Sequence, residues 1–392
     1  MGIIVRYILR ELGVTFLFGF VAFSSVFLFV GLVKRAMDED LPLIYIWRIV
    51  PFVFVEMSFI ALPVTLLLAV TIFFARMSGN NEVIALKALG VPPKAFLLPV
   101  FMIAFVVSII GFHINEQAIT WGRPGINVVL YSGAEDILIK RLRKNKRFET
   151  PDNQITILVN GVDDQNQLIE PTIMLKKESA TIEAQTAKIT IDYDTDILTV
   201  TLIGIRMVSD RMRYEGGNRA IPISLAQIIP GGKSNSASNM ALDRINEERN
   251  RAAEQIEHQR RVIAAHKTFA ASMGSVDAWA GTPHIEHAKS RIRSLQSQIQ
   301  RLSVEPPRRW ANGFSCFFFV LLGAPLAIWM KKSDFFSSFF ACFVPILLLY
   351  YPLLMFGLER AKNGTLPPMC VWTANIGIGL IGLWFLRQIH RY

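Results

Sequence analysis

Six apolar blocks divide this chain, and they restrict its fold more than any other feature. They lie at residues 13–33, 49–75, 95–115, 313–330, 335–358 and 369–386. Each block approaches the roughly 20 apolar residues that an α-helix needs to cross a bilayer. The chain is 52% hydrophobic and only 18% charged, whereas soluble domains carry about a quarter charged residues. The sequence therefore predicts a membrane α-helical protein with six transmembrane helices.

The three cysteines, Cys316, Cys342 and Cys370, all fall inside predicted spans. A disulfide framework or a zinc site would instead place its cysteines in the polar regions. We therefore interpret them as small core residues. The first apolar block is too long for a removed signal peptide and lacks a small-residue cleavage site.

Positive charges are distributed unevenly between the two ends of the predicted spans. With the N-terminus in the cytoplasm, the short outer loops carry five basic residues: Lys34, Arg35, Arg48, Arg360 and Lys362. The short inner segments then carry nine: Arg6, Arg10, Arg76, Lys87, Lys94, Lys331, Lys332, Arg387 and Arg391. The positive-inside rule favours this orientation, with both termini cytoplasmic. Residues 116–310 then lie outside the cytoplasm.

The first part of this large insert is rich in β-branched residues. Strand-like runs at 155–159, 172–177, 188–193 and 197–208 are separated by clusters of Asp, Asn and Gly. This spacing predicts an extracytoplasmic all-β domain of sandwich or jellyroll type over residues 116–232.

The second part of the insert changes to a helical pattern. Apolar residues from Ile285 to Leu302 recur every three or four positions, and residues 242–263 follow the same register. A turn-like stretch, residues 272–283, separates the two segments. We expect an inserted helical hairpin at 233–305 with a coiled-coil-like seam between its helices, although a charged, partly ordered stalk is an alternative.

The motifs that would indicate an enzyme are absent or incomplete. The run at 232–234 resembles the end of a phosphate-binding loop, but Gln227 stands where that loop requires glycine. His284 and His287 lack the spacing of a zinc protease. A nucleophile elbow is absent as well. We therefore expect no catalytic residues, no metal site and no cofactor.

Ionisable residues near the apolar blocks are rarer and carry more information. Glu56 lies about one third of the way along the second block, where it is either buried against a partner helix or close to the outer interface. Lys34 and Arg35 end the first span. They either snorkel at the interface or contact an anionic substrate. The basic run at 140–147 is either a solvated face or a contact for phosphates or anionic lipids.

A short stretch between the second and third blocks has its own helix signals. Ser78 or Asn80 suits an N-cap, Glu82 a first turn, and Lys87 a last turn. Gly90 suits the left-handed position after a helix end, and two prolines follow it. The pattern predicts a helix at about residues 80–90, on the cytoplasmic side of the membrane.

Such a helix is too short to fold alone, so it must lie on another surface. Val83, Leu86 and Leu89 with Gly90 are expected to form its apolar side. We interpret the helix as a docking element for a cytoplasmic partner, with a plain connecting turn as the alternative.

Several segments carry a resemblance to a known family. The opening IIVRYILREL, the run LPVTLLLAV with the following NNEVIALKALGVPPKAF, and RRWANGFSCFFFVLLGAPLAI appear in that order. YYPLLMFGLERAKNGTLPPMCVWTANIGIG follows them. Together they resemble the lipopolysaccharide-export permeases of the LptF/LptG family across all six spans. The opening segment and DEDLP at 38–42 favour the LptF type.

The resemblance implies a non-catalytic permease subunit of an ABC exporter. Such a subunit pairs with a second permease of the same family, as a heterodimer or homodimer, in the bacterial inner membrane. A cytoplasmic ABC ATPase dimer binds the ATP. The pair takes lipopolysaccharide, or a related anionic glycolipid, from the membrane, and the jellyroll domain passes it to a periplasmic bridge protein.

Residue roles follow from the same resemblance. Glu82 matches the acid of the family's coupling helix, and Leu86 and Lys87 accompany it in ATPase coupling. Lys34 and Arg35, with Glu56, are the candidates for substrate contact. Residues 1–115 would hold spans one to three and residues 306–392 spans four to six. The hairpin at 233–305 departs from the family pattern, which leaves the bridge partner open.

Two other functions remain compatible with the sequence. An envelope scaffold or assembly protein would anchor the β-domain without transport. An ion-driven secondary transporter would need broken helices and polar groups near the midplane. The mostly uninterrupted apolar blocks do not favour the transporter.

Overall fold

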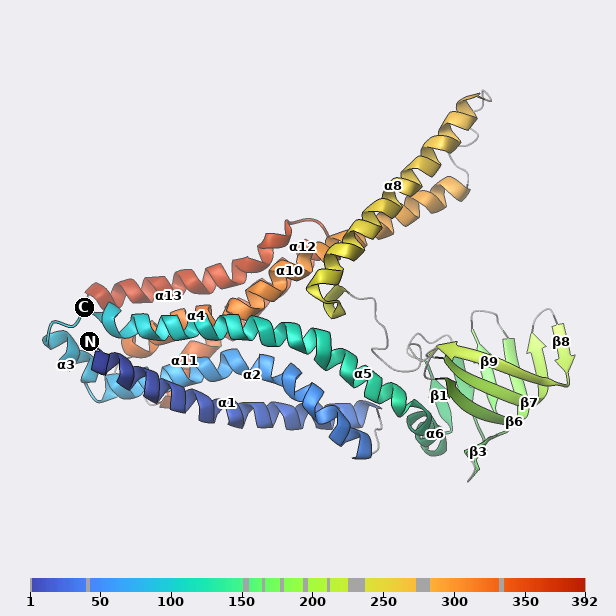
Figure 1. The fold of residues 1–392 in the computed structure, drawn as a ribbon, viewed down its shortest axis with the longest axis horizontal. Helices are drawn as coiled ribbons and strands as arrows, with labels where there is room; N and C mark the ends of the chain where they lie inside the picture. Colours follow the sequence, from blue (N-terminus) through green and yellow to red (C-terminus); the bar gives the residue numbers. More distant parts are fainter. Residues whose placement is uncertain are drawn as a thin grey trace. The chain divides into compact units, whose positions relative to one another are not determined.

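The computed structural model describes residues 2–39, 43–150, 155–163, 166–176, 180–192, 197–209, 212–224, 237–272, 283–330 and 335–391. The chain forms two compact units. The first comprises residues 1–27, 56–120 and 236–392, and the second residues 28–55 and 121–235. The first unit is helical, whereas the second contains an antiparallel sheet and short helices (Figure 1).

The first half of the chain supplies three long helices and several short ones. They are α1 (Gly2–Glu39), α2 (Leu43–Gly79), α3 (Glu82–Ala88), α4 (Pro93–Gln117), the π-helix η1 (Ala118–Gly122), α5 (Arg123–Ser132) and α6 (Ala134–Asn145). The second half adds the 3₁₀-helix η2 (Ala237–Asn239), α8 (Leu242–Ser272), α10 (Pro283–Trp329), α11 (Phe335–Pro345), the π-helix η3 (Ile346–Tyr350), α12 (Tyr351–Lys362), the 3₁₀-helix η4 (Pro368–Trp372) and α13 (Thr373–Arg391).

Within the described residues, six helical segments are long and apolar enough to cross a membrane. They are Gly2–Met37, Ile44–Gly79, Pro93–Ser132, Ile285–Trp329, Ser337–Lys362 and Pro368–Ile389. The prediction of six transmembrane helices is confirmed at this level. A helix satisfies its backbone N–H and C=O groups by hydrogen bonds within the same segment. The hydrocarbon core of a bilayer requires this, because it offers no water as a partner.

The first unit is held together by two apolar clusters. One joins α1, α2, α3 and α4 to the last third of α10 and the end of α13, through buried residues such as Leu66, Phe74, Phe96, Val320 and Ile389. The other joins α10 to α11, η3, α12, η4 and α13. The long helix α10 contributes to both clusters, so it is the central element of this unit.

Helix α10 continues through Pro306 and Pro307, where the sequence suggested a domain boundary. A proline pair removes two amide donors and usually interrupts a helix. Here Leu302 and Val304 are buried on one side of the pair and Ala311 on the other. The helix is therefore packed against the protein before and after the two prolines. The domain boundary predicted between residues 305 and 306 falls inside this single helix.

Helix α8 packs against the first part of α10. Ala252 and Ile256 of α8 and Leu295 of α10 are buried together, with Ile292 and Ile299 partly buried beside them. These residues follow the heptad-like spacing seen in the sequence. The turn of the predicted hairpin, residues 273–282, lies outside the described residues.

The second unit contains a nine-stranded antiparallel sheet. Its strands are β1 (Arg147–Glu149), β2 (Ile155–Leu158), β3 (Gly161–Val162), β4 (Leu168–Ile169), β5 (Thr172–Leu175), β6 (Ala180–Asp192), β7 (Ile197–Ser209), β8 (Met212–Glu215) and β9 (Asn218–Ser224). The sheet lies within the region predicted to be β-rich. The jellyroll arrangement and the hairpin stay predictions.

The two longest strands, β6 and β7, pair along their whole length. The other edge of β6 pairs with β5 and then β4, and the other edge of β7 pairs with β9 and β8. Gly204 in β7 has a φ of +70°, and a Cβ there would lie 2.9 Å from Gln185 of β6. Glycine is therefore favoured at this point, where the pairing register of β6 and β7 skips Gln185 and Gly204.

Candidate functional site

The short helix α3 connects α2 to α4 at the end of the helical unit where both chain termini lie (Figure 1). The predicted N-cap was wrong. Helix α2 extends to Gly79, and the Ser78 hydroxyl is buried and donates to the carbonyl of Ile328, 3.4 Å away. Asn81 takes the N-cap position with a φ of 59°, and its side chain makes no capping hydrogen bond with the described residues.

The end of α3 is as the sequence predicts. Gly90 has a φ of +78°, the left-handed conformation that glycine adopts without strain. The amide of Val91 donates to Leu86 O at 3.0 Å, and the amide of Gly90 to Lys87 O at 2.9 Å. This pair of bonds is the Schellman motif, and it satisfies carbonyls that the helix leaves unpaired.

One side of α3 is packed against the bundle. Val83 is buried, and Leu86 packs against the same apolar cluster, which also contains Leu386 and Ile389 of α13. The ammonium of Lys87 donates to the carbonyl of Ile389 at 3.0 Å. Leu86 and Lys87, two of the predicted coupling residues, therefore face the protein and hold α3 in place.

The other side of α3 is apolar and exposed. Ile84 is 59% exposed and Leu89 is 79% exposed, with Ala85 and Ala88 exposed between them. The expectation that Leu89 belongs to the buried side was wrong, because the helix ends at Ala88 and Leu89 already lies in its C-terminal cap. Sequence reasoning also missed Ile84, whose exposure depends on which face the bundle covers.

Glu82 begins α3 beside this exposed side. Its carboxylate is half-buried and accepts a hydrogen bond from the Asn80 amide at 3.3 Å. A carboxylate at the first turn is also stabilised by the helix dipole. The same end of the bundle is reinforced by an ion pair between Glu11 of α1 and Arg76 of α2. The acid thus stands next to an apolar surface on a well-supported helix.

The predicted substrate-contact residues lie on two helices. Lys34 and Arg35 are in the last part of α1, where Lys34 is exposed and Arg35 half-buried. They belong to the second unit. Glu56 is half-buried in α2 and belongs to the first unit. Arg35 and Glu56 both interact with other groups.

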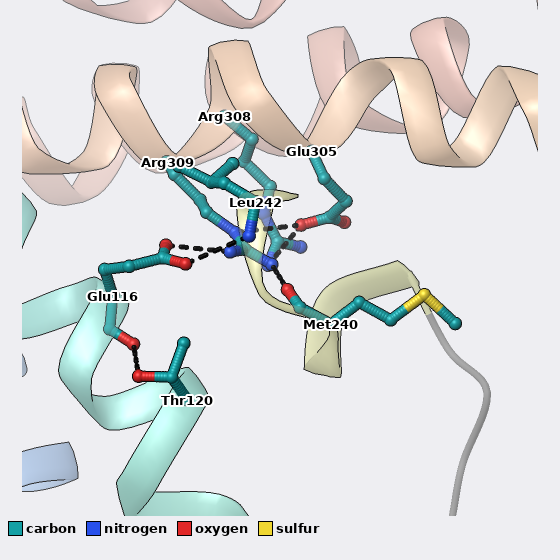
Figure 2. A network of polar contacts seen from close by, with 7 residues as sticks. All are labelled: Glu116, Thr120, Met240, Leu242, Glu305, Arg308 and Arg309. Atoms are coloured by element: carbon teal, nitrogen blue, oxygen red, sulfur yellow. Dashed lines mark hydrogen bonds and ion pairs between the residues drawn. The ribbon is translucent and has the colours of Figure 1, made fainter. Parts of the chain in front are cut away.

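A cluster of charged side chains lies where α4, α8 and α10 meet (Figure 2). Arg309 of α10 is fully buried, and its Nη1 lies 2.8 Å from Glu116 Oε2 of α4. The other guanidinium nitrogen, Nη2, donates to the carbonyl of Met240. Glu116 accepts the amide of Leu242, the first residue of α8, at 3.1 Å.

Two further members of this cluster come from α10 itself. Glu305 is 1% exposed and lies 3.2 Å from the guanidinium of Arg308. Its Oε2 is also 4.0 Å from Arg309 Nε. Because each buried charge has an opposite charge beside it, the desolvation cost is partly offset. Sequence reasoning missed this cluster, although the run of charges just before an apolar span was visible.

The sheet of the second unit carries a cleft of about 920 Å³. Lys146, Arg147 and Arg206 line it together with Glu170 and Glu183. Partial desolvation would raise the pKa of nearby Glu149. However, hydrogen bonds from Lys176 and Arg147 outweigh that effect and lower this pKa below its ordinary value. The cleft is therefore polar and mixed in charge.

Other motifs from the sequence add no site. Among the described residues, no group of three or more His, Cys, Asp or Glu side chains could hold a metal ion. The run at 232–234 and the side chain of His284 lie outside the described residues. Cys316 and Cys342 are buried and Cys370 is partly buried, all three as free thiols.

In the part of the chain that the structure describes, six membrane-length helices, a short supported helix between two of them and an antiparallel sheet are the features of a polytopic membrane protein. The family described as "Lipopolysaccharide export system permease LptF/LptG" matches residues 6–388, nearly the whole chain. The chain belongs to this family of inner-membrane transport permeases. A comparison with curated proteins finds no match.

Proposed function

We propose that this chain is the membrane-spanning permease half of an ABC exporter. In this proposal it extracts lipopolysaccharide, or a related anionic glycolipid, from the inner membrane and passes it to a periplasmic bridge protein. ATP would be bound and hydrolysed by a separate cytoplasmic ATPase dimer. The observation that carries the proposal is the family match over residues 6–388.

The form of α3 supports an ATPase contact at this helix. A small helix fixed on one side and apolar on the other suits a groove in a partner, because its exposed side gains hydrophobic burial on docking. Ile84 and Leu89 would enter the groove, and Glu82 would meet a basic residue at its rim. Leu86 and Lys87 would keep the helix seated on the permease.

Substrate contact is proposed for Lys34, Arg35 and Glu56. The two cations near the end of span one would attract phosphates of the lipid. Glu56 would help to shape the polar entrance. The cleft in the sheet, with its cationic lining, would receive the lipid before the bridge protein does.

A second permease of the same family would complete the transporter. The apolar surfaces of spans one and five support this proposal, because both spans are largely exposed in the single chain. The excess of basic residues in the short segments of one end supports cytoplasmic termini and a periplasmic sheet.

Affinity purification of the tagged full-length chain from its native membrane tests the proposal. The wild-type chain should copurify with an ABC-type ATPase that has no membrane spans of its own. Glu82→Arg should reduce the copurified ATPase by about tenfold, as expected for the loss of a charge pair in a docked interface. Lys94→Glu, a charge reversal at an exposed position at the start of α4, is the matched control.

A protein that acts as an envelope scaffold would be indifferent to Glu82→Arg. If no such ATPase copurifies with the wild-type chain, or if the two variants retain it equally, the proposed function is wrong.

A further inference from the structure

Lys87 occupies the junction between α3 and the last turn of α13. Its ammonium donates to the carbonyl of Ile389, two residues before α13 ends at Arg391. The last carbonyls of a helix have no partner within the helix, and they carry the negative end of the helix dipole. A lysine ammonium therefore satisfies an orphan acceptor and gains a favourable charge interaction at the same time.

Apolar packing reinforces this polar contact. Val83 and Leu86 of α3 belong to the same buried cluster as Leu386 and Ile389 of α13. The hydrogen bond of Lys87 thus joins α3 to α13 beside an apolar cluster to which both helices contribute. A displacement of α3 would break this hydrogen bond and disturb the apolar cluster that the two helices share.

Helix α13 is in turn seated on α10 by an unusually close approach. A Cβ at Gly382 would lie 2.4 Å from the carbonyl oxygen of Leu321, and a Cβ at Gly379 would lie 2.9 Å from Phe318. Pro325 has no amide hydrogen, so the Leu321 carbonyl four residues earlier lacks its usual helical donor. The glycine of α13 lies against this freed carbonyl.

A buried polar contact joins the same two helices further along. The side-chain amide nitrogen of Asn375, fully buried in α13, donates to the carbonyl of Ala311 in α10 at 2.8 Å. The close approach at Gly379 and Gly382 and the buried hydrogen bond of Asn375 hold α13 against α10 at two places. We therefore expect the two helices to move together. Helix α10 then continues to the charged cluster around Arg309 and to the contact with α8.

We infer that Lys87 is a positioning residue that transmits displacement of α3 to the sixth span, α13, and through it to α10. The inference rests on the proposed function, because the displacement would come from an ATPase docked on α3. It assigns Lys87 a role distinct from that of Glu82 and Ile84. Those residues bind the partner, whereas Lys87 links the docked helix to the spans.

The test uses the wild-type complex purified with its copurifying ATPase and reconstituted in proteoliposomes that contain lipopolysaccharide. Three quantities are measured: bound ATPase, ATP turnover, and lipopolysaccharide released from the vesicles. Lys87→Met keeps the aliphatic stem and removes the ammonium. Lys87→Arg restores a cationic donor, and Lys94→Met removes an exposed ammonium from the same end of the chain.

We expect Lys87→Met to keep its ATPase and its ATP turnover within about twofold, while lipopolysaccharide release falls by about tenfold, within the usual range of coupling between sites. Lys87→Arg should recover most of the release, and Lys94→Met should resemble the wild type. A purely structural role would lower bound ATPase, turnover and release together.

Two results overturn the inference: equal release by Lys87→Met and the wild type, or loss of ATPase binding to the extent seen with Glu82→Arg. If Lys87→Met lowers the yield of folded protein, Leu386→Ala replaces it, since it weakens the packing of α13 against the apolar cluster that α3 shares and keeps the ammonium. Release that is unchanged in Leu386→Ala then overturns the inference. Failure of the wild-type complex to release lipopolysaccharide counts against the proposed function instead.

Discussion

The guanidinium of Arg309 lies 2.8 Å from the carboxylate of Glu116, and this pair of residues, 193 positions apart in the sequence, joins α4 to α10. Glu116 simultaneously accepts the first amide of α8, and Arg309 donates to the carbonyl of Met240. One partly buried ion pair and its hydrogen bonds thereby join the end of α4, the start of α8 and the middle of α10. Charged contacts thus add to apolar packing, which includes the buried Ile245 and Leu302, where α8 begins.

Arg309→Met should destabilise the protein strongly, because it leaves the Glu116 carboxylate without its cation and removes one of the two cations beside the buried Glu305. Removal of one partner from a buried pair typically costs about 3–5 kcal/mol. Thermal unfolding of the purified chain in detergent should show the loss. Arg301→Met, an exposed position two turns earlier in α10, is the control and should change little.

The double variant Arg309→Met with Glu116→Gln separates the ion pair from the arginine's other contacts. Glutamine keeps an acceptor for the Leu242 amide but carries no charge. The double variant should lose less than the sum of the two single variants, since the second change removes the stranded charge. Simple additivity would show that the two side chains do not stabilise each other.

Gly382→Ala should disrupt the packing of α13 on α10. The added methyl group would meet the backbone of Leu321 at 2.4 Å, and backbone cannot move aside as a flexible side chain can. Overpacking of this kind costs about 1–3 kcal/mol, so the thermal midpoint should fall. Gly377→Ala on the same helix is the control, because its methyl group would meet a leucine side chain at an ordinary 3.6 Å. Equal midpoints for the two variants would contradict the close approach.

The six spans could be predicted because a membrane span is a local property of about 20 consecutive residues. The end of α3 could be predicted for the same reason, since Gly90 and the prolines after it act within one turn. The N-cap could not, because the extent of α2 is decided by packing such as the contact of Ser78 with Ile328, 250 residues away.

The exposed apolar side of α3 could not be predicted from the sequence either. Ile84 and Leu86 are both apolar and two positions apart, and only the tertiary structure decides that one is exposed and the other packed. The sequence placed Lys87 in the last turn of α3 but gave no sign of its acceptor, because that acceptor is a backbone carbonyl 302 residues later. A hydrogen bond from a side chain to a distant backbone carbonyl leaves no pattern in a single sequence, because any residue can supply that carbonyl.

Gly90→Ala should weaken the end of α3. The left-handed conformation at φ +78° costs a residue with a Cβ roughly 1–2 kcal/mol more than glycine. We expect faster hydrogen exchange at the amides of Gly90 and Val91, which close the Schellman motif. Gly79→Ala is the control, because a Cβ there meets nothing within 4 Å and its φ is outside the positive range. Unchanged exchange in Gly90→Ala would mean that the motif contributes little to α3.

Substitutions on the exposed apolar side of α3 can distinguish an effect on ATPase binding from an effect on the stability of the fold. Ile84→Asp and Leu89→Asp place a charge on a surface that is already exposed, so the thermal midpoint of the chain alone should hardly change. The same charges would be buried without a partner in a docked interface, so the copurified ATPase should fall by about tenfold or more. Leu86→Ala is the converse variant. It opens space in the buried cluster and should lower the thermal midpoint, while the side presented to the ATPase keeps its chemistry. If Ile84→Asp and Leu89→Asp retain the ATPase at the wild-type level, this side of α3 is not the docking surface, whatever Glu82 does.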